Sequence, residues 1–125
     1  MKISITLPGS IRSKKNSKRI YKHGKHTAVL PSKAYIEWEK IARDAIYYIH
    51  NITQDNILKS SPVSINAQIY YKGQQPDLSG CLESIGDAME GYLWENDKQI
   101  YSWDGSRLHH DLKNPRTELI VEYSK

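Results

Sequence analysis

Two aspartates stand where catalytic carboxylates are often found, at the ends of predicted elements. Asp77 follows an alternating apolar segment and precedes an amphipathic one, and Asp97 lies in a short polar stretch further along the chain. Mg²⁺ prefers oxygen ligands and keeps several waters, so two or three converging carboxylates and a substrate phosphate can complete a site. Asp77 and Asp97 could supply that minimum. Spacing alone favours a simpler interpretation, in which Asp77 caps a helix and Asp97 belongs to a solvated turn.

Other catalytic motifs are missing from the sequence. It contains no Gly-x-Ser-x-Gly elbow, no Walker phosphate loop, no Gly-x-Gly-x-x-Gly and no His-Glu-x-x-His. The only cysteine, Cys81, can form neither an internal disulfide nor a zinc site built on a cysteine pair. We expect it to be a small buried side chain.

The apolar pattern predicts the elements that position the aspartates. Alternation predicts strands at 2–7, 62–72, 99–103 and 117–123, and a 3.6-residue period predicts helices at 33–49, capped by Ser32, and at 78–93. Residues 10–32 keep no period and are predicted as an exposed loop, with a hairpin or ordering on a ligand as alternatives. The order β-α-β-α-β-β predicts one α/β (α+β) domain over 1–125, with a small mixed sheet covered by two main helices.

Charge is distributed unevenly along the chain. Residues 1–36 carry +9 and residues 37–125 carry −5, which gives the formal net charge of +4. A basic arm at about 9–32 attracts a polyanion, so nucleic acid is the expected partner, and a solvated loop is the alternative. The candidate DNA-binding residues are Lys14, Lys15, Lys18, Arg19, Lys22, Lys25 and Arg107. With neither a membrane-length apolar stretch nor a signal-peptide pattern at 1–9, we expect a soluble cytoplasmic protein and no membrane partner.

Three segments carry a resemblance to a known family: Gln75-Pro76-Asp77-Leu78-Ser79-Gly80, Asp87-Ala88-Met89 and Trp94-Glu95-Asn96-Asp97-Lys98-Gln99-Ile100. In these, and in a first strand that ends at Pro8, the sequence resembles the endodeoxyribonuclease RusA family of Holliday-junction resolvases. The resemblance implies a homodimer that cuts four-way DNA junctions symmetrically in a bacterial or phage-infected cell. It also implies Mg²⁺, with Mn²⁺ as a substitute, and makes Asp77 and Asp97 its ligands.

The chain departs from the family at two positions. The family core reads Asp-Leu-Asp-Asn, whereas here Ser79 and Gly80 follow Leu78, so the second aspartate is missing. The family's helical lysine falls at Glu83. Because Ser79, Glu83 and Asp87 are four residues apart, they would share one helix face, and Glu83 could replace the lost carboxylate. An ordinary solvated helix position is the alternative for Glu83.

Further side chains are candidates for supporting the ligands without holding the ion: Ser79, Asp87 and Asp104. Asp104 is followed by Gly105, so an ordinary turn is the simpler interpretation. His109 and His110 are expected at the surface or in packing. Two rival functions remain open from the sequence, a branched-DNA binder without catalytic activity and a nuclease for forks, flaps or RNA-containing hybrids.

Overall fold

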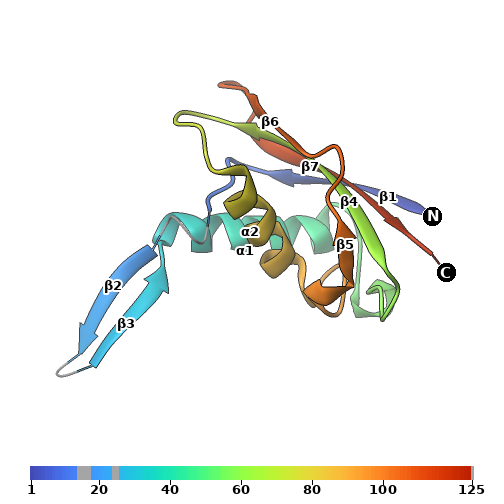
Figure 1. The fold of residues 1–125 in the computed structure, drawn as a ribbon, viewed down its shortest axis with the longest axis horizontal. Helices are drawn as coiled ribbons and strands as arrows, with labels where there is room; N and C mark the ends of the chain where they lie inside the picture. Colours follow the sequence, from blue (N-terminus) through green and yellow to red (C-terminus); the bar gives the residue numbers. More distant parts are fainter. Residues whose placement is uncertain (14–17, 24–25, 125) are drawn as a thin grey trace.

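A mixed sheet forms the body of the protein (Figure 1). The computed structural model describes residues 1–13, 18–23 and 26–124. Three long strands lie side by side with antiparallel neighbours, in the order β1 (Lys2–Pro8), β7 (Arg116–Tyr123) and β4 (Val63–Tyr71). The other edge of β4 pairs in parallel with two short strands, with β5 (Ile100–Ser102) beside its beginning and β6 (Arg107–His110) beside its end. The predicted mixed α+β class is confirmed.

Both helices pack against one face of this sheet. Alternate residues of the long strands are buried, including Leu7, Ile65 and Leu119, and they form a single apolar core with side chains of both helices. Helix α1 (Lys33–Tyr48) begins as predicted at Ser32, whose Oγ accepts the backbone N–H of Tyr35 at 3.1 Å. Helix α2 (Leu78–Met89) runs beside α1. The site residues of α2 are therefore fixed by a packed layer beneath them.

The predicted end of the second helix is wrong. Helix α2 stops at Met89, because Gly91 adopts φ +82° and the chain turns, with the N–H groups of Tyr92 and Leu93 both donating to the Met89 carbonyl at 2.9 Å. Leu93 is buried as its apolar character suggested, although it is buried in the turn. This turn leads directly into the segment that carries Asp97.

The basic arm is partly a hairpin, which confirms the hairpin that the sequence left open for this predicted loop. Strands β2 (Lys18–His23) and β3 (His26–Pro31) pair with each other in antiparallel fashion and do not join the main sheet. The hairpin directly precedes α1 (Figure 1). The predicted order β-α-β-α-β-β is therefore incomplete, because it lacks the two hairpin strands and β6. Lys18, Arg19 and Lys22 fall on β2, whereas Lys14, Lys15 and Lys25 lie outside the described residues.

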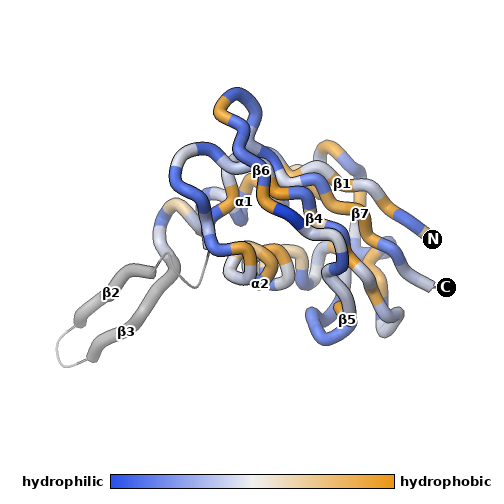
Figure 2. Tube along the Cα trace, turned by 45° about the horizontal axis from the view of Figure 1, so that its top comes forward, coloured by the Kyte–Doolittle hydropathy of each residue, from blue (hydrophilic) through white to orange (hydrophobic). Residues whose placement is uncertain are grey.

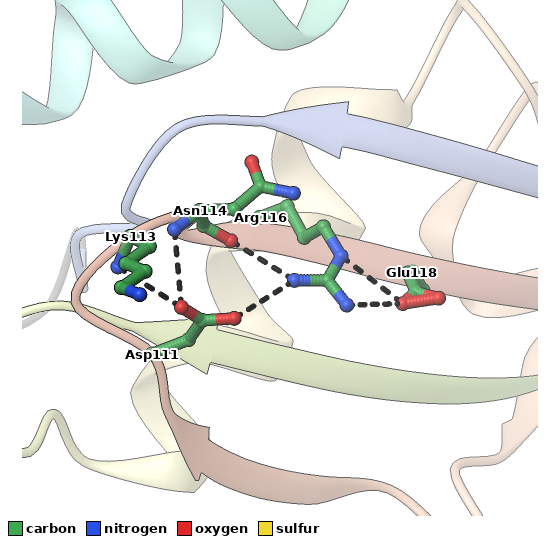
Figure 3. A network of polar contacts seen from close by, with 5 residues as sticks. All are labelled: Asp111, Lys113, Asn114, Arg116 and Glu118. Carbon is green, nitrogen blue, oxygen red and sulfur yellow. Dashed lines mark hydrogen bonds and ion pairs between the residues drawn. The ribbon is translucent and has the colours of Figure 1, made fainter.

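A network of polar side chains fixes the turn between β6 and β7 (Figure 3). The Asp111 carboxylate accepts the backbone N–H groups of Lys113 and Asn114 at 3.0 and 3.1 Å. Arg116 donates to Asp111 at 3.2 Å and also pairs with Glu118. These backbone N–H groups, and secondarily Arg116, lower the pKa of Asp111 below its ordinary value. The network therefore stabilises one end of the sheet.

Among the described residues, no helix is long and apolar enough to span a membrane.

Candidate functional site

An open cleft of about 360 Å³ lies between α2 and the segment 97–103; we call it the α2 cleft. Its polar lining residues are Ser79, Glu83, Asp87 and Asp97. Three consecutive turns of α2 contribute the first three, as their four-residue spacing predicts, and the fourth comes from the other wall. The remaining lining residues are Leu82, Gly86, Ile100 and Trp103. The cleft thus brings together three carboxylates that the sequence singled out.

Asp97 is carried by a tightly held segment. Asn96 accepts the backbone N–H of Lys98 at 2.9 Å through its side chain, and its own N–H donates to the Gln99 side chain at 2.9 Å. The Gln99 amide also donates to the carbonyls of Leu58 and Ser61, both at 3.0 Å. The side chains on both sides of Asp97 are therefore occupied in shaping a single 3₁₀ turn, Asp97–Gln99.

The Asp97 carboxylate is left available by this arrangement. Its backbone N–H donates to Glu90 at 3.1 Å, but its side chain makes no hydrogen bond or ion pair with a residue that the structure describes. Glu83, which is exposed on α2, likewise has no such partner in the described part of the chain. Two unpaired carboxylates from separate elements therefore face the same cleft.

Asp77 takes the N-cap position of α2 without making the usual cap hydrogen bond. Its carboxylate accepts the Ser79 hydroxyl at 3.1 Å and faces a second cleft, so it does not line the α2 cleft. Ser79 lines the α2 cleft and is the direct link between the two. Within residues 1–13, 18–23 and 26–124, no three His, Cys, Asp or Glu side chains lie close enough together to hold a metal ion by themselves.

The donor set nevertheless suits a hard cation. Asp97 and Glu83 offer only oxygen, and both are open to solvent, as Mg²⁺ requires when it keeps most of its waters and takes one or two carboxylates. The residues present therefore fit a hydrated Mg²⁺ completed by substrate phosphate, and they do not form an all-protein cage. Asp87 lines the same cleft, but its charge also acts on the buried hydroxyl of Tyr35 in α1.

Other predicted site residues lie elsewhere. Asp104 is exposed in a turn closed by the Ser106 N–H donating to the Trp103 carbonyl at 3.2 Å, and it does not line the α2 cleft. Arg107 pairs with Gln68, so it lies on the sheet face away from the helices. His109 contacts the Gln68 side chain at 2.7 Å, in keeping with the packing role expected of it.

A second cleft, of about 310 Å³, contains two cations that sequence reasoning missed. We call it the Asp77 cleft; it lies between residues 10–13 and the loop 71–77, which is mostly hydrophilic (Figure 2). Arg12 and Lys72 line it together with Asp77. Most of the predicted DNA-binding residues belong to the basic run at 14–25, and the only sequence signal for Lys72 is its place at the end of a strand that leads to Asp77.

Cys81 is buried at the beginning of α2, as its residue type suggested. Burial raises the pKa of its thiol to about 12, and the nearby negative charge of Asp77 adds to that shift. The thiol therefore stays protonated near neutral pH, which excludes it as an activated nucleophile there.

The chain was also compared with known proteins. No protein-family model matches it, and no curated protein has a matching sequence. The resemblance carried by residues 75–100 therefore stays a prediction. The side chains that line the two clefts and the distribution of charge are the features of the chain that bear on its function.

Proposed function

We propose that the chain is a Mg²⁺-dependent, structure-specific endodeoxyribonuclease that resolves four-way junctions in DNA recombination and repair. The observation that carries this proposal is the pair of unpaired carboxylates, Asp97 and Glu83, in the α2 cleft. The segment around Asp97 uses its neighbouring polar side chains to hold the backbone, while the aspartate itself faces the cleft. The basic N-terminal part of the chain supports a polyanionic substrate.

The proposed reaction is hydrolysis of a phosphodiester. When bound, Mg²⁺, or Mn²⁺ in its place, would supply a water of lowered pKa and charge stabilisation of the leaving oxygen. Asp97 and Glu83, which line the two walls of the cleft, would hold the ion. Ser79 lies between this pair and Asp77, and its hydroxyl fixes the orientation of the Asp77 carboxylate through the 3.1 Å hydrogen bond. Asp77 therefore adjoins the α2 cleft through Ser79, while it lines the neighbouring cleft.

A branched-DNA binder without catalytic activity is the second candidate. Two observations favour it: the described residues hold no group of three ligands, and Ser79 stands where the resembled family has an aspartate. Such a protein would keep the basic arm and lose the chemistry. A nuclease that prefers forks, flaps or RNA-containing hybrids would share the active site and differ only in substrate.

Cleavage of an end-labelled four-way junction separates these functions. The wild-type protein is incubated with Mg²⁺, Mn²⁺ or EDTA, and the products are resolved on a denaturing gel beside those from linear duplex, fork, flap and hybrid substrates. We expect paired nicks at the junction with either cation and none in EDTA. Junction binding without nicks under every condition would contradict the nuclease and favour the binder, whereas faster cutting of another substrate would reassign the specificity.

Replacing Glu83 by Ala is expected to reduce junction cleavage by at least roughly 10- to 100-fold, the loss typical of residues that support a metal centre. Junction binding at moderate salt should survive, because Glu83 is an acidic residue with no partner among the described residues. Glu37→Ala is the matched control, since Glu37 is an exposed glutamate on α1 that does not line the α2 cleft. Unchanged turnover in Glu83→Ala would remove this residue from the site.

We also propose that the protein acts as a homodimer, because a four-way junction has near two-fold symmetry and two opposed strands must be cut. Exposed apolar residues on the outer side of α1 support an interface there. Ile41, Tyr48 and Ile49 are 48%, 74% and 61% exposed, and together with Pro8 they line a shallow apolar hollow. An exposed apolar patch of this kind suits an isologous contact between two α1 helices.

Tyr48→Glu is expected to convert the dimer to a monomer, because it would bury a charge in that contact. Light scattering after size-exclusion chromatography measures the mass, and circular dichroism checks that the fold is kept. Tyr101→Glu is the matched control, since Tyr101 on β5 is 71% exposed and does not line the apolar hollow. A wild-type protein that is already monomeric would overturn the dimer.

A further inference from the structure

The Asp77 cleft has the composition of an anion-binding site. Its polar lining comes from two segments that are about sixty residues apart in the sequence, and it includes Ser10, Arg12, Lys72, Gln74, Gln75 and Asp77. Hydroxyl and amide groups in this set can donate hydrogen bonds, and two of the residues are cationic. Only one of the residues is acidic.

The backbone on both sides of this cleft is anchored. Ile11 and Ser13 are buried while Arg12 between them is exposed, so the anchored chain presents Arg12 to the outside. The Ser84 hydroxyl donates to the Arg12 carbonyl at 3.0 Å, which ties this segment to α2. On the opposite side, the Lys72 N–H donates to the Ser10 hydroxyl at 3.3 Å. The positions of the two cations are thus set by packing and by backbone hydrogen bonds.

Gly80 allows this arrangement. A Cβ at position 80 would collide with the side chain of Ser13 and would also contact the Asp77 carboxylate at 3.4 Å. Glycine therefore lets residues 10–13 lie directly on the first turn of α2. Ser79 and Gly80, which differ from the resembled family, lie where residues 10–13 pack against the first turn of α2 beside Asp77. This segment carries Arg12.

The two cations are free to bind a ligand. Neither Arg12 nor Lys72 forms an ion pair with a residue in the described ranges, although Asp77 lines the same cleft. Arg43 and Arg116 are, by contrast, already committed: Arg43 pairs with Glu39 at 3.1 Å and Arg116 with Asp111 at 3.2 Å. Uncommitted Arg and Lys side chains on anchored backbone are suited to phosphate oxygens, with arginine able to bind two at once.

We propose that Arg12 and Lys72 form a phosphate-binding subsite for a nucleic-acid backbone, which holds the strand beside the bond that is hydrolysed. This inference rests on the proposed nuclease function for its position in the reaction, but not for the binding itself. The cleft is open to solvent, and Arg12 lies two residues before Lys14, where the basic stretch begins. The subsite places positive charge beside Asp77. The helix of this chain has Glu83 at the position where the resembled family has a lysine, so it supplies no cation there.

The test is the salt dependence of binding, measured by fluorescence anisotropy with a labelled four-way junction in EDTA over a series of KCl concentrations. Each phosphate contact contributes about 0.9 to the slope of log affinity against log salt. Arg12→Ala and Lys72→Ala should each lower that slope by about 1 and weaken binding roughly five- to tenfold at 0.1 M salt. Lys72→Arg should restore the wild-type slope.

Lys40→Ala is the matched control, since Lys40 is an exposed lysine on α1 outside the cleft and should leave the slope unchanged. Wild-type slopes and affinities in both Arg12→Ala and Lys72→Ala would overturn the subsite. Displacement of the junction by inorganic phosphate far beyond that by KCl at the same ionic strength would indicate a free-anion site and also overturn it. Because no cleavage is needed, a wild-type protein that binds through both residues but never cuts would refute the nuclease and leave the subsite supported.

Discussion

Replacing Asp97 by Asn is expected to abolish Mg²⁺-dependent junction cleavage while leaving junction binding intact. The substitution keeps the size of the side chain and removes the charge on which a hard cation depends. Because loss of residues that merely support a metal centre costs roughly 10- to 100-fold, we expect more than about 100-fold for a ligand. Gel assays of initial cleavage rates with Mg²⁺ measure this effect, and anisotropy in EDTA measures binding separately.

The same substitution should leave the fold unchanged. The Asp97 carboxylate makes no hydrogen bond or ion pair with the described residues, so thermal unfolding of Asp97→Asn should match that of the wild type. Asp104→Asn is the matched control, because it makes the identical chemical change in an exposed turn that does not line the α2 cleft, and it should cleave normally. If Asp97→Asn cut at the wild-type rate, the α2 cleft would not be the active site.

Elements whose signals are local could be predicted from the sequence. Helix α1 was predicted to within one residue because its cap at Ser32 and its apolar period agree with each other. The end of α2 was misplaced because Leu93 continues the apolar period, whereas Gly91 ends the helix by adopting a backbone conformation that glycine favours. A local turn decided the helix end, and hydrophobic periodicity could not show it.

Strand β6 could not be predicted for a different reason. Its four residues, Arg107–His110, include only one aliphatic side chain, Leu108, and no alternation long enough to recognise. The strand exists because it pairs with the end of β4, where Leu108 lies opposite the buried Ile69. That pairing joins residues about forty positions apart and leaves no local pattern.

The candidate site likewise includes some features that the sequence could indicate and others that it could not. Glu83 and Asp87 share a cleft because helical spacing puts them on one face, which the sequence could indicate. That Asp77 would turn toward Ser79 and line the neighbouring cleft depends on a side-chain orientation at the start of α2. Arg12 and Lys72 meet only because the strand that precedes Arg12 and the one that ends before Lys72 flank β7 in the folded sheet. The proximity of Arg12 and Lys72 follows from the strand order of the sheet, and no local sequence pattern predicts it.

Trp94→Ala is expected to cause the largest loss of stability among these variants. The side chain is fully buried, and its indole N–H donates to the Gly86 carbonyl of α2 at 3.2 Å. Truncating a buried Trp to Ala typically costs about 3 to 5 kcal/mol, which is a large share of the roughly 5 to 15 kcal/mol that stabilise a domain. Urea unfolding followed by circular dichroism should show a much lower midpoint, with Tyr101→Ala as the exposed aromatic control.

Trp94 also connects stability to the proposed chemistry, because it ties the segment that carries Asp97 to the helix that carries Glu83. Trp94→Phe, which keeps a large ring and removes the hydrogen bond, should cost only about 1 to 3 kcal/mol and leave the protein folded for assay. We expect this variant to bind junctions normally and to cleave more slowly, since the two walls of the α2 cleft lose a connection. If Trp94→Phe were destabilised but cleaved at the wild-type rate, Trp94 would contribute to packing alone, and alignment of Asp97 with Glu83 would depend on the Asn96 and Gln99 hydrogen bonds.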